Sequence, residues 1–95
     1  MRFEGIYTPV ITPYRQDHSI DRDAFAAMVE YLIDAGVHGI IVAGTTGEYY
    51  AQTPVERVEL MTLARDIIGT RLPLIIGTGA IRTEEAVGYA EAAKD

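Results

Sequence analysis

The stretch Gly39-Ile-Ile-Val-Ala-Gly-Thr-Thr-Gly-Glu48 decides the fold of this chain. Its four consecutive apolar residues are typical of a parallel strand that is buried on both faces. The strand then enters a glycine-rich turn that carries two adjacent hydroxyls and one carboxylate. Backbone amides and threonine hydroxyls in such a turn can hold a carboxylate or phosphate at the carboxyl end of a strand.

Two similar apolar runs flank this strand along the chain. The runs Gly5–Ile11 and Pro73–Gly77 begin 34 residues before and 34 residues after Gly39. This spacing is close to the size of one strand-plus-helix unit. The two segments between the runs have the apolar periodicity of amphipathic helices. The apolar residues of the first segment are Phe25, Met28, Val29, Leu32 and Ile33, and those of the second are Leu60, Met61, Ala64, Ile67 and Ile68.

Local signals predict the helix boundaries. The first helix is expected from about Asp21 to Ala35, with Gly36 ending it in the left-handed conformation. In the second, Thr53 is the expected N-cap, Pro54 suits the first helical position and Glu56 completes a capping box. The third should start near Thr83 and offer a small-residue face for close packing, made of Ala86, Ala90 and Ala93.

The predicted element order is βαβαβα, which indicates an α/β fold with right-handed crossovers. Three parallel strands alone leave both edges of the sheet open, which is an aggregation hazard. We therefore expect residues 1–95 to be the N-terminal portion of a single, truncated TIM-barrel domain, the first three units of a (β/α)8 barrel of roughly 270 residues. Alone, this portion should be poorly soluble or oligomeric.

Composition excludes several classes of function. The 95 residues are 48% apolar and carry a net charge of −6, which is unsuited to nucleic acid. There is no cysteine, hence no disulfide framework and no thiolate metal site. No apolar run approaches the roughly 18 residues of a membrane span. A soluble, cytoplasmic protein without nucleic-acid or membrane partners is expected.

The loops after the three strands are the expected location of any chemistry. Thr45, Thr46, Thr78 and Arg82 are hydrogen-bond donors on these loops and would suit an anionic small molecule. A purely structural role is the alternative to anion binding. Threonines in a glycine turn often cap a helix or close a turn, and Arg82 can simply be solvated. Glu48 is expected to fix its loop by accepting backbone N–H bonds.

Other polar and aromatic residues give weaker signals. His18 and His38 are separated by a whole helix, with His38 at the opposite end of its strand, so no metal site is expected. Tyr49 and Tyr50 either line a pocket or pack against the second helix. Gly77-Thr-Gly-Ala80 lacks the third glycine of a dinucleotide fingerprint, so no cofactor is expected.

Three motifs together resemble the dihydrodipicolinate synthase and N-acetylneuraminate lyase superfamily. Gly44-Thr-Thr-Gly-Glu48 resembles its signature at the end of the second strand. Thr8-Pro-Val-Ile-Thr-Pro-Tyr14 resembles its first strand and loop, and Leu74-Ile-Ile-Gly-Thr-Gly-Ala80 its third. The resemblance spans the whole chain and implies a (β/α)8 barrel, usually a homotetramer. It also implies chemistry on pyruvate or a related 2-keto acid through a Schiff base on a barrel lysine.

The resemblance assigns roles to individual residues. Thr45 resembles the threonine of a proton relay with two tyrosines, and is the expected catalytic residue. Thr46 resembles the threonine that holds the keto-acid carboxylate, aided by backbone N–H groups of the turn. The expected substrate-binding residues are thus Thr46, Thr45, Gly47 and Thr8.

Two departures from the family pattern limit these expectations. The single lysine, Lys94, lies near the end of the third helix, where it should face outward. In this family the Schiff-base lysine and the relay tyrosines come from later strands, so residues 1–95 alone are expected to be inactive. The feedback site for lysine in the synthase branch also lacks its usual polar pattern at the corresponding positions, which are Tyr49, Pro54, Arg57 and Ile81.

A phosphate-binding α/β domain would fit the glycine loops but lacks a P-loop lysine and a full dinucleotide motif. Three other functions remain open at this point. The first is a class I aldolase-type lyase or synthase similar to 4-hydroxy-tetrahydrodipicolinate synthase. The second is a keto-deoxy-sugar-acid dehydratase or aldolase of the same superfamily. The sequence Glu48-Tyr-Tyr50 favours such members over the best-known synthases. The third is a non-catalytic partial-barrel module that assembles with itself or with a partner, in which Thr45 and Thr46 are merely structural.

Overall fold

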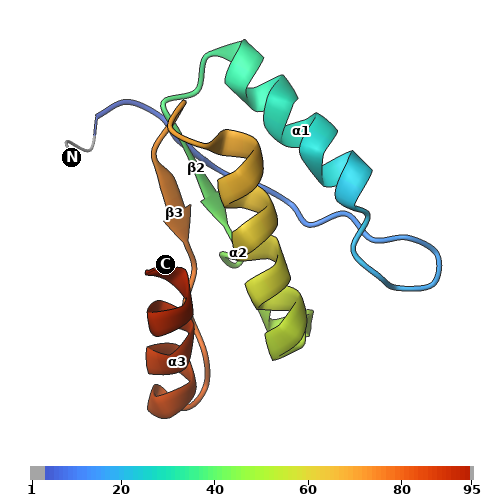
Figure 1. Ribbon diagram of the computed structural model, residues 1–95, viewed down its shortest axis with the longest axis vertical. Helices are drawn as coiled ribbons and strands as arrows, with labels where there is room; N and C mark the ends of the chain where they lie inside the picture. The colour runs from blue at the N-terminus through green and yellow to red at the C-terminus, as the bar shows by residue number, and fades with distance from the viewer. Residues whose placement is uncertain (1–3, 95) are drawn as a thin grey trace.

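The computed structural model describes residues 4–94, in which strands and helices alternate along the chain (Figure 1). The elements are β1 (Tyr7–Pro9), α1 (Arg22–Ala35), β2 (Gly39–Val42), the 3₁₀ helix η1 (Tyr49–Ala51), α2 (Pro54–Ile68), β3 (Leu74–Ile76) and α3 (Thr83–Ala93). This confirms the predicted βαβαβα order. The 3₁₀ helix is the element that the sequence did not predict.

The three strands form one parallel sheet in the order β1-β2-β3. Ile40 in the central strand lies opposite Thr8 on one side and Leu74 on the other. The strands are shorter than the apolar runs that predicted them, because regular pairing stops after three or four residues. One further bond, from the Gly77 amide to the Val42 carbonyl at 2.8 Å, ties the residue after β3 to the end of β2.

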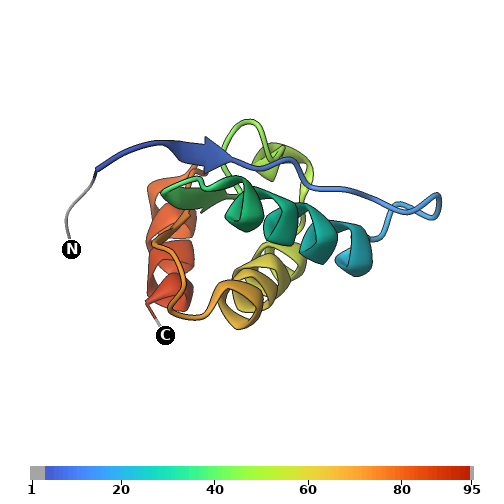
Figure 2. The same ribbon diagram turned by 90° about the horizontal axis from the view of Figure 1, so that it is seen from above.

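The core lies between the sheet and the helices α1 and α2, which lie on the same side of the strands (Figure 2). Its fully buried side chains come from both layers and are Phe25, Val29, Ile40, Val42, Leu60, Ala64 and Ile68. Ile41 and Ile75 alternate with the core residues of their strands, so their side chains lie on the opposite face of the sheet. None of the described helices is long and apolar enough to cross a membrane.

The predicted caps at Gly36 and at Thr53 with Glu56 are confirmed, and Asp21 is an N-cap that the sequence did not predict. The Asp21 side chain accepts a bond from the Ala24 amide, and Gly36 ends α1 at φ 90°. In α2, Thr53 and Glu56 form the reciprocal capping box, with distances of 3.2 Å and 2.8 Å. These local bonds satisfy amide groups that the first helical turn leaves unpaired, and so fix where each helix starts.

The predicted packing of α3 is wrong. None of its residues is buried, and the small-residue face of Ala86, Ala90 and Ala93 is half-buried or exposed. The helix is instead attached through Tyr89, whose ring centroid lies 3.8 Å from the guanidinium carbon of Arg57 in α2. An aromatic ring on a cation thus replaces the close small-residue contact that the alanines suggested.

The segment between β1 and α1 is more ordered than a plain loop. Tyr14 and Ile20 form an antiparallel bridge, and the Arg15 amide donates to the Ser19 carbonyl at 2.7 Å. At its tip, Asp17 accepts bonds from both the amide and the hydroxyl of Ser19. These bonds favour the ionised carboxylate and lower the pKa of Asp17 below its ordinary value.

Gly77→Ala and Gly88→Ala form a matched pair that tests the closest contact of the sheet. A Cβ at Gly77 would lie 2.1 Å from the Ala43 carbonyl oxygen, whereas a Cβ at Gly88 would meet nothing within 4 Å. We expect Gly77→Ala to lower the free energy of unfolding by at least about 2 kcal/mol, since backbone must move. Gly88→Ala, inside α3, should raise it by about 0.5–1 kcal/mol. Urea denaturation followed by circular dichroism measures both, and equal effects would contradict this contact.

Candidate functional site

Three loops meet at the edge of the sheet where the strands end, here called the carboxyl edge. Parallel order places the segments that follow β1, β2 and β3 on the same side. The turn Gly44–Glu48 lies between the other two segments, because Thr12 contacts it from the β1 side and Gly77 contacts its base from the β3 side. The predicted residues Thr45, Thr46 and Gly47 all lie in this turn.

The turn starts from a backbone that sequence reasoning did not foresee. Ala43 is buried at φ 59° and Glu48 stands at φ 60°, both in the left-handed region that residues with a Cβ seldom adopt. The Glu48 amide donates to the Thr45 carbonyl at 3.0 Å, which closes the turn. The expectation for the Glu48 carboxylate is wrong, since it accepts no hydrogen bond from any described residue and is exposed.

The turn is instead anchored through the carbonyl oxygen of Gly47. This oxygen accepts a bond from the Thr12 hydroxyl at 2.7 Å and another from the Gln52 side-chain amide at 3.0 Å. The same Gln52 nitrogen lies 3.1 Å from the Thr12 oxygen, and all three groups are buried. The Gln52 oxygen Oε1 is buried without a partner among the described residues, so the three bonds made by Thr12 and the Gln52 nitrogen are what hold the Gly47 carbonyl in place.

The anchor uses the Gly47 carbonyl, and the donors of the turn are left without partners in the described part of the chain. Among residues 4–94, no hydrogen bond joins the amides of Thr46 and Gly47, or the hydroxyls of Thr45 and Thr46, to another residue. Both threonines are exposed. Two amides and two hydroxyls at the end of a strand form a neutral donor set that suits a carboxylate.

Thr8 is not brought to this turn. It lies within β1, opposite Ile40, so its side chain shares the face of the sheet that carries the buried Ile40 side chain. Thr45 and Thr46 belong to the segment beyond the carboxyl end of β2. The geometry therefore groups three of the four predicted binding residues and leaves Thr8 on its strand.

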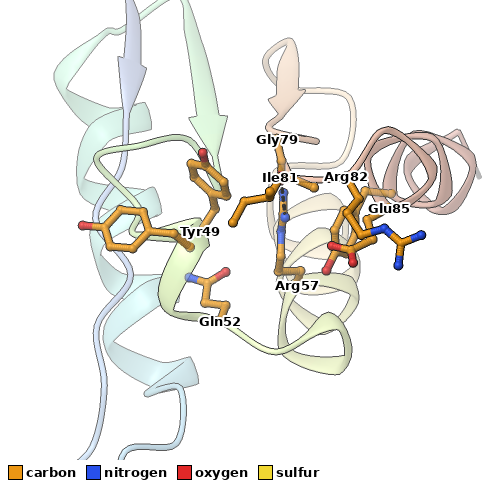
Figure 3. Close-up of a pocket in the computed structure, with 10 residues that line it drawn as sticks. Tyr49, Gln52, Arg57, Gly79, Ile81, Arg82 and Glu85 are labelled. Atoms are coloured by element: carbon orange, nitrogen blue, oxygen red, sulfur yellow. Dashed lines mark hydrogen bonds between the residues drawn. The ribbon is translucent and has the colours of Figure 1, made fainter.

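A second feature, a cleft of about 360 Å³, lies between η1, α2 and the loop before α3 (Figure 3). Its lining includes Tyr49, Arg57, Arg82 and Glu85. Tyr49 both lines this cleft and packs towards α2, with its ring centroid 5.1 Å from the Arg57 guanidinium carbon. Arg82 faces this cleft rather than the turn, and its exposed side chain lies 3.5 Å from Glu84.

The remaining predicted residues lie apart from the turn. His38 Nδ1 accepts a bond from the Ile6 amide at 2.9 Å, at the amino end of β2. His18 lies at the tip of the loop after β1, at φ 72°. Lys94 is exposed at the C-cap of α3, as predicted. Within the described part of the chain, no three His, Asp or Glu side chains come together as a metal site.

Sequence reasoning missed Thr12, Gln52 and Arg57 as supports of the site. In the sequence, Thr12 is only one residue of the Thr8–Tyr14 motif, and Gln52 lies beside the N-cap Thr53, where polar residues are usual. Arg57 is 2% exposed, although arginine near a helix start is ordinarily a surface residue. No local signal marks these three, because each contacts a segment distant in sequence.

Known proteins with the same fold and similar sequence are dihydrodipicolinate synthases and their relatives. A 4-hydroxy-tetrahydrodipicolinate synthase from Chelativorans sp. is 41% identical over 92 residues, which are 97% of this chain and 31% of that protein. The chain thus spans about a third of the length of the curated relatives that it matches.

Solved structures agree with the sequence comparison. YagE from E. coli K12, a member of the dihydrodipicolinic acid synthase family solved in complex with pyruvate, matches with a TM-score of 0.93 and 34% identity over 97% of this chain and 31% of that one. The dihydrodipicolinate synthase from Acinetobacter baumannii, also complexed with pyruvate, gives 0.92 and 33% over 96% and 31%.

The family model described as the dihydrodipicolinate synthetase family matches residues 2–95. Its solved members are TIM barrels, of which this chain covers about 32%. The alternating parallel strands and helices described above have the arrangement of the N-terminal part of such a barrel. The chain belongs to the dihydrodipicolinate synthetase family, and its three βα units are the N-terminal three units of a (β/α)8 barrel.

Proposed function

We propose that this protein is a class I aldolase-type lyase or synthase that acts on pyruvate or a related 2-keto acid, similar to 4-hydroxy-tetrahydrodipicolinate synthase. In this proposal residues 1–95 are the N-terminal portion of a single TIM-barrel domain. Support comes from the family match and from relatives that were solved with pyruvate. The observation that carries the proposal is the turn Gly44–Glu48 with its unpaired donors.

The turn fits one half of a 2-keto acid. Thr46, with the amides of Thr46 and Gly47, would hold the carboxylate through charge-assisted hydrogen bonds. Thr45, the neighbouring hydroxyl, would pass protons to and from the reacting carbonyl while an imine forms and is hydrolysed. A carboxylate held in this way presents the adjacent ketone in one orientation to an attacking amine.

The amine itself comes from outside residues 1–95. Lys94 is the one lysine of the chain, and it is exposed at the C-cap of α3. An amine that must attack at neutral pH needs a site that lowers its pKa, which burial or a neighbouring cation provides. Lys94 lies at the opposite end of α3 from the loop that follows β3, so a lysine elsewhere in the barrel forms the Schiff base.

The same proposal includes a cytoplasmic homo-oligomer, by analogy with tetrameric members of the family. On this chain, Tyr50 and Ile81 are 67% and 103% exposed and border the same cleft. Large apolar side chains gathered at one place favour a protein contact. Light scattering of the full-length protein would give the assembly size, and a monomer at micromolar concentration would contradict this part of the proposal.

Borohydride trapping tests the Schiff base directly. The full-length protein, incubated with pyruvate and sodium borohydride, should gain the mass of one reduced pyruvate adduct per chain. Peptide mapping should place the adduct outside residues 1–95. Omission of pyruvate is the control. The mechanism would be abandoned if no adduct forms. An adduct on Lys94 would contradict the inference that this lysine does not form the Schiff base.

Thr46→Val tests the carboxylate clamp. Because a hydrogen bond to a charged group contributes about 1.5–3 kcal/mol, removing the hydroxyl should raise the KM for pyruvate roughly tenfold to a hundredfold. Thr46→Ser, which keeps a hydroxyl, should recover most of the loss. The matched control is Thr62→Val on the exposed side of α2, which should leave KM unchanged. A KM for Thr46→Val equal to that of the control would remove Thr46 from the site.

A further inference from the structure

The least expected group in this structure is the guanidinium of Arg57. The residue lies in the second turn of α2 and is only 2% exposed. No ion pair joins it to a carboxylate among the described residues. Burying a cation without a counter-ion is costly unless other groups replace its water. The protein groups that surround the buried guanidinium in place of water therefore indicate the role of Arg57.

Two kinds of contact surround the guanidinium. It lies over the ring of Tyr89 from α3 and near the ring of Tyr49 from η1, with centroid distances of 3.8 Å and 5.1 Å. Its two terminal nitrogens donate to the backbone carbonyls of Gly79 at 2.6 Å and Gly77 at 2.8 Å. In Figure 3 the Arg57 side chain points towards Gly79. The planar fork thus bonds two carbonyls of one loop at the same time.

The two carbonyls flank Thr78, at the point where the β3 segment meets the turn. The Gly77 amide donates to Val42, and the space beside Gly77 is filled by the Ala43 carbonyl and the Gly44 amide. The segment of residues 77–79 is therefore held between Arg57 on the helix side and the base of the turn on the strand side. If this segment moves outward, the turn loses its support.

We infer that Arg57 is a positioning residue, which holds the loop after β3 against the base of the Gly44–Glu48 turn from the helix side of the sheet. It does not contact the substrate. Through Gly77 it fixes where the turn begins, and through Tyr49 it supports the residue that follows the turn. The effect on activity rests on the proposed function, whereas the effect on the two loops does not.

The test uses the full-length protein with Arg57→Lys and Arg57→Met. Lysine keeps the charge but lacks the planar fork whose two nitrogens bond the two carbonyls, and methionine keeps much of the volume without charge. Arg65→Met, on the exposed side of the same helix, is the matched control. Hydrogen exchange followed by mass spectrometry should accelerate at least threefold in peptides that cover residues 74–80 and 43–49. Exchange in α1 should stay unchanged.

Pyruvate kinetics supply the second readout. Misplacing a binding group by about 1 Å can cost up to roughly a hundredfold in rate. We expect Arg57→Met to lower kcat/KM for pyruvate tenfold or more, mainly through KM, and Arg57→Lys to lower it less. Arg65→Met should match the wild type in exchange and kinetics.

The outcomes separate this inference from the proposed function. If the wild type traps no pyruvate, the proposed function fails, and the exchange data alone decide on Arg57. A lower melting temperature with unchanged exchange in the two peptides, or a uniform acceleration throughout the protein, would make Arg57 merely structural and overturn the inference. If Arg57→Met does not fold, Arg57→Lys decides by the same two readouts.

Discussion

The ends of β2 and β3 touch backbone to backbone, and the carboxyl edge of the sheet is built around this contact. Gly77 faces the carbonyl of Ala43 so closely that no side chain fits between them. Its amide also donates to Val42, so the two strands approach closely where both change direction. Ala43 meets this constraint by adopting φ 59°, an unfavourable conformation for a residue with a Cβ. The left-handed conformation of Ala43 therefore sets the direction in which the turn leaves the sheet.

The residues after the turn then hold both neighbouring loops. Gln52, just before α2, bonds the Thr12 hydroxyl of the loop after β1, and Arg57, one turn into the helix, bonds the carbonyls of Gly77 and Gly79. The capping box at Thr53 lies between them and fixes where the helix starts. A local helix signal therefore sets the position of two long-range anchors. Their polar atoms are buried, so each bond resists opening more than an exposed bond would.

Features encoded by local chemistry could be predicted from the sequence, and features that depend on distant partners could not. Gly36 and Thr53 define helix ends through bonds within a few residues, and both were placed correctly. The turn itself was found because its glycines and threonines are adjacent in sequence. Gln52, by contrast, bonds a residue 40 positions away, and a single sequence carries no sign of such a pair. The alanines of α3 led to a wrong prediction of close helix packing, because a face of small residues does not specify which element it packs against.

The donor set of the turn is electrically neutral, which suits the proposed chemistry. In the proposed mechanism the Schiff-base intermediate carries a positive charge when its nitrogen is protonated, and the carboxylate bonded to the imine carbon would stabilise that charge. A cation in the carboxylate site would offset that stabilisation, whereas amides and hydroxyls hold the carboxylate without cancelling its charge. The guanidinium of Arg57 is directed at the carbonyls of the β3 loop and packed between two tyrosine rings on the helix side. The structure thus uses the rigidity of an arginine fork to support the loops while it keeps the positive charge out of the turn.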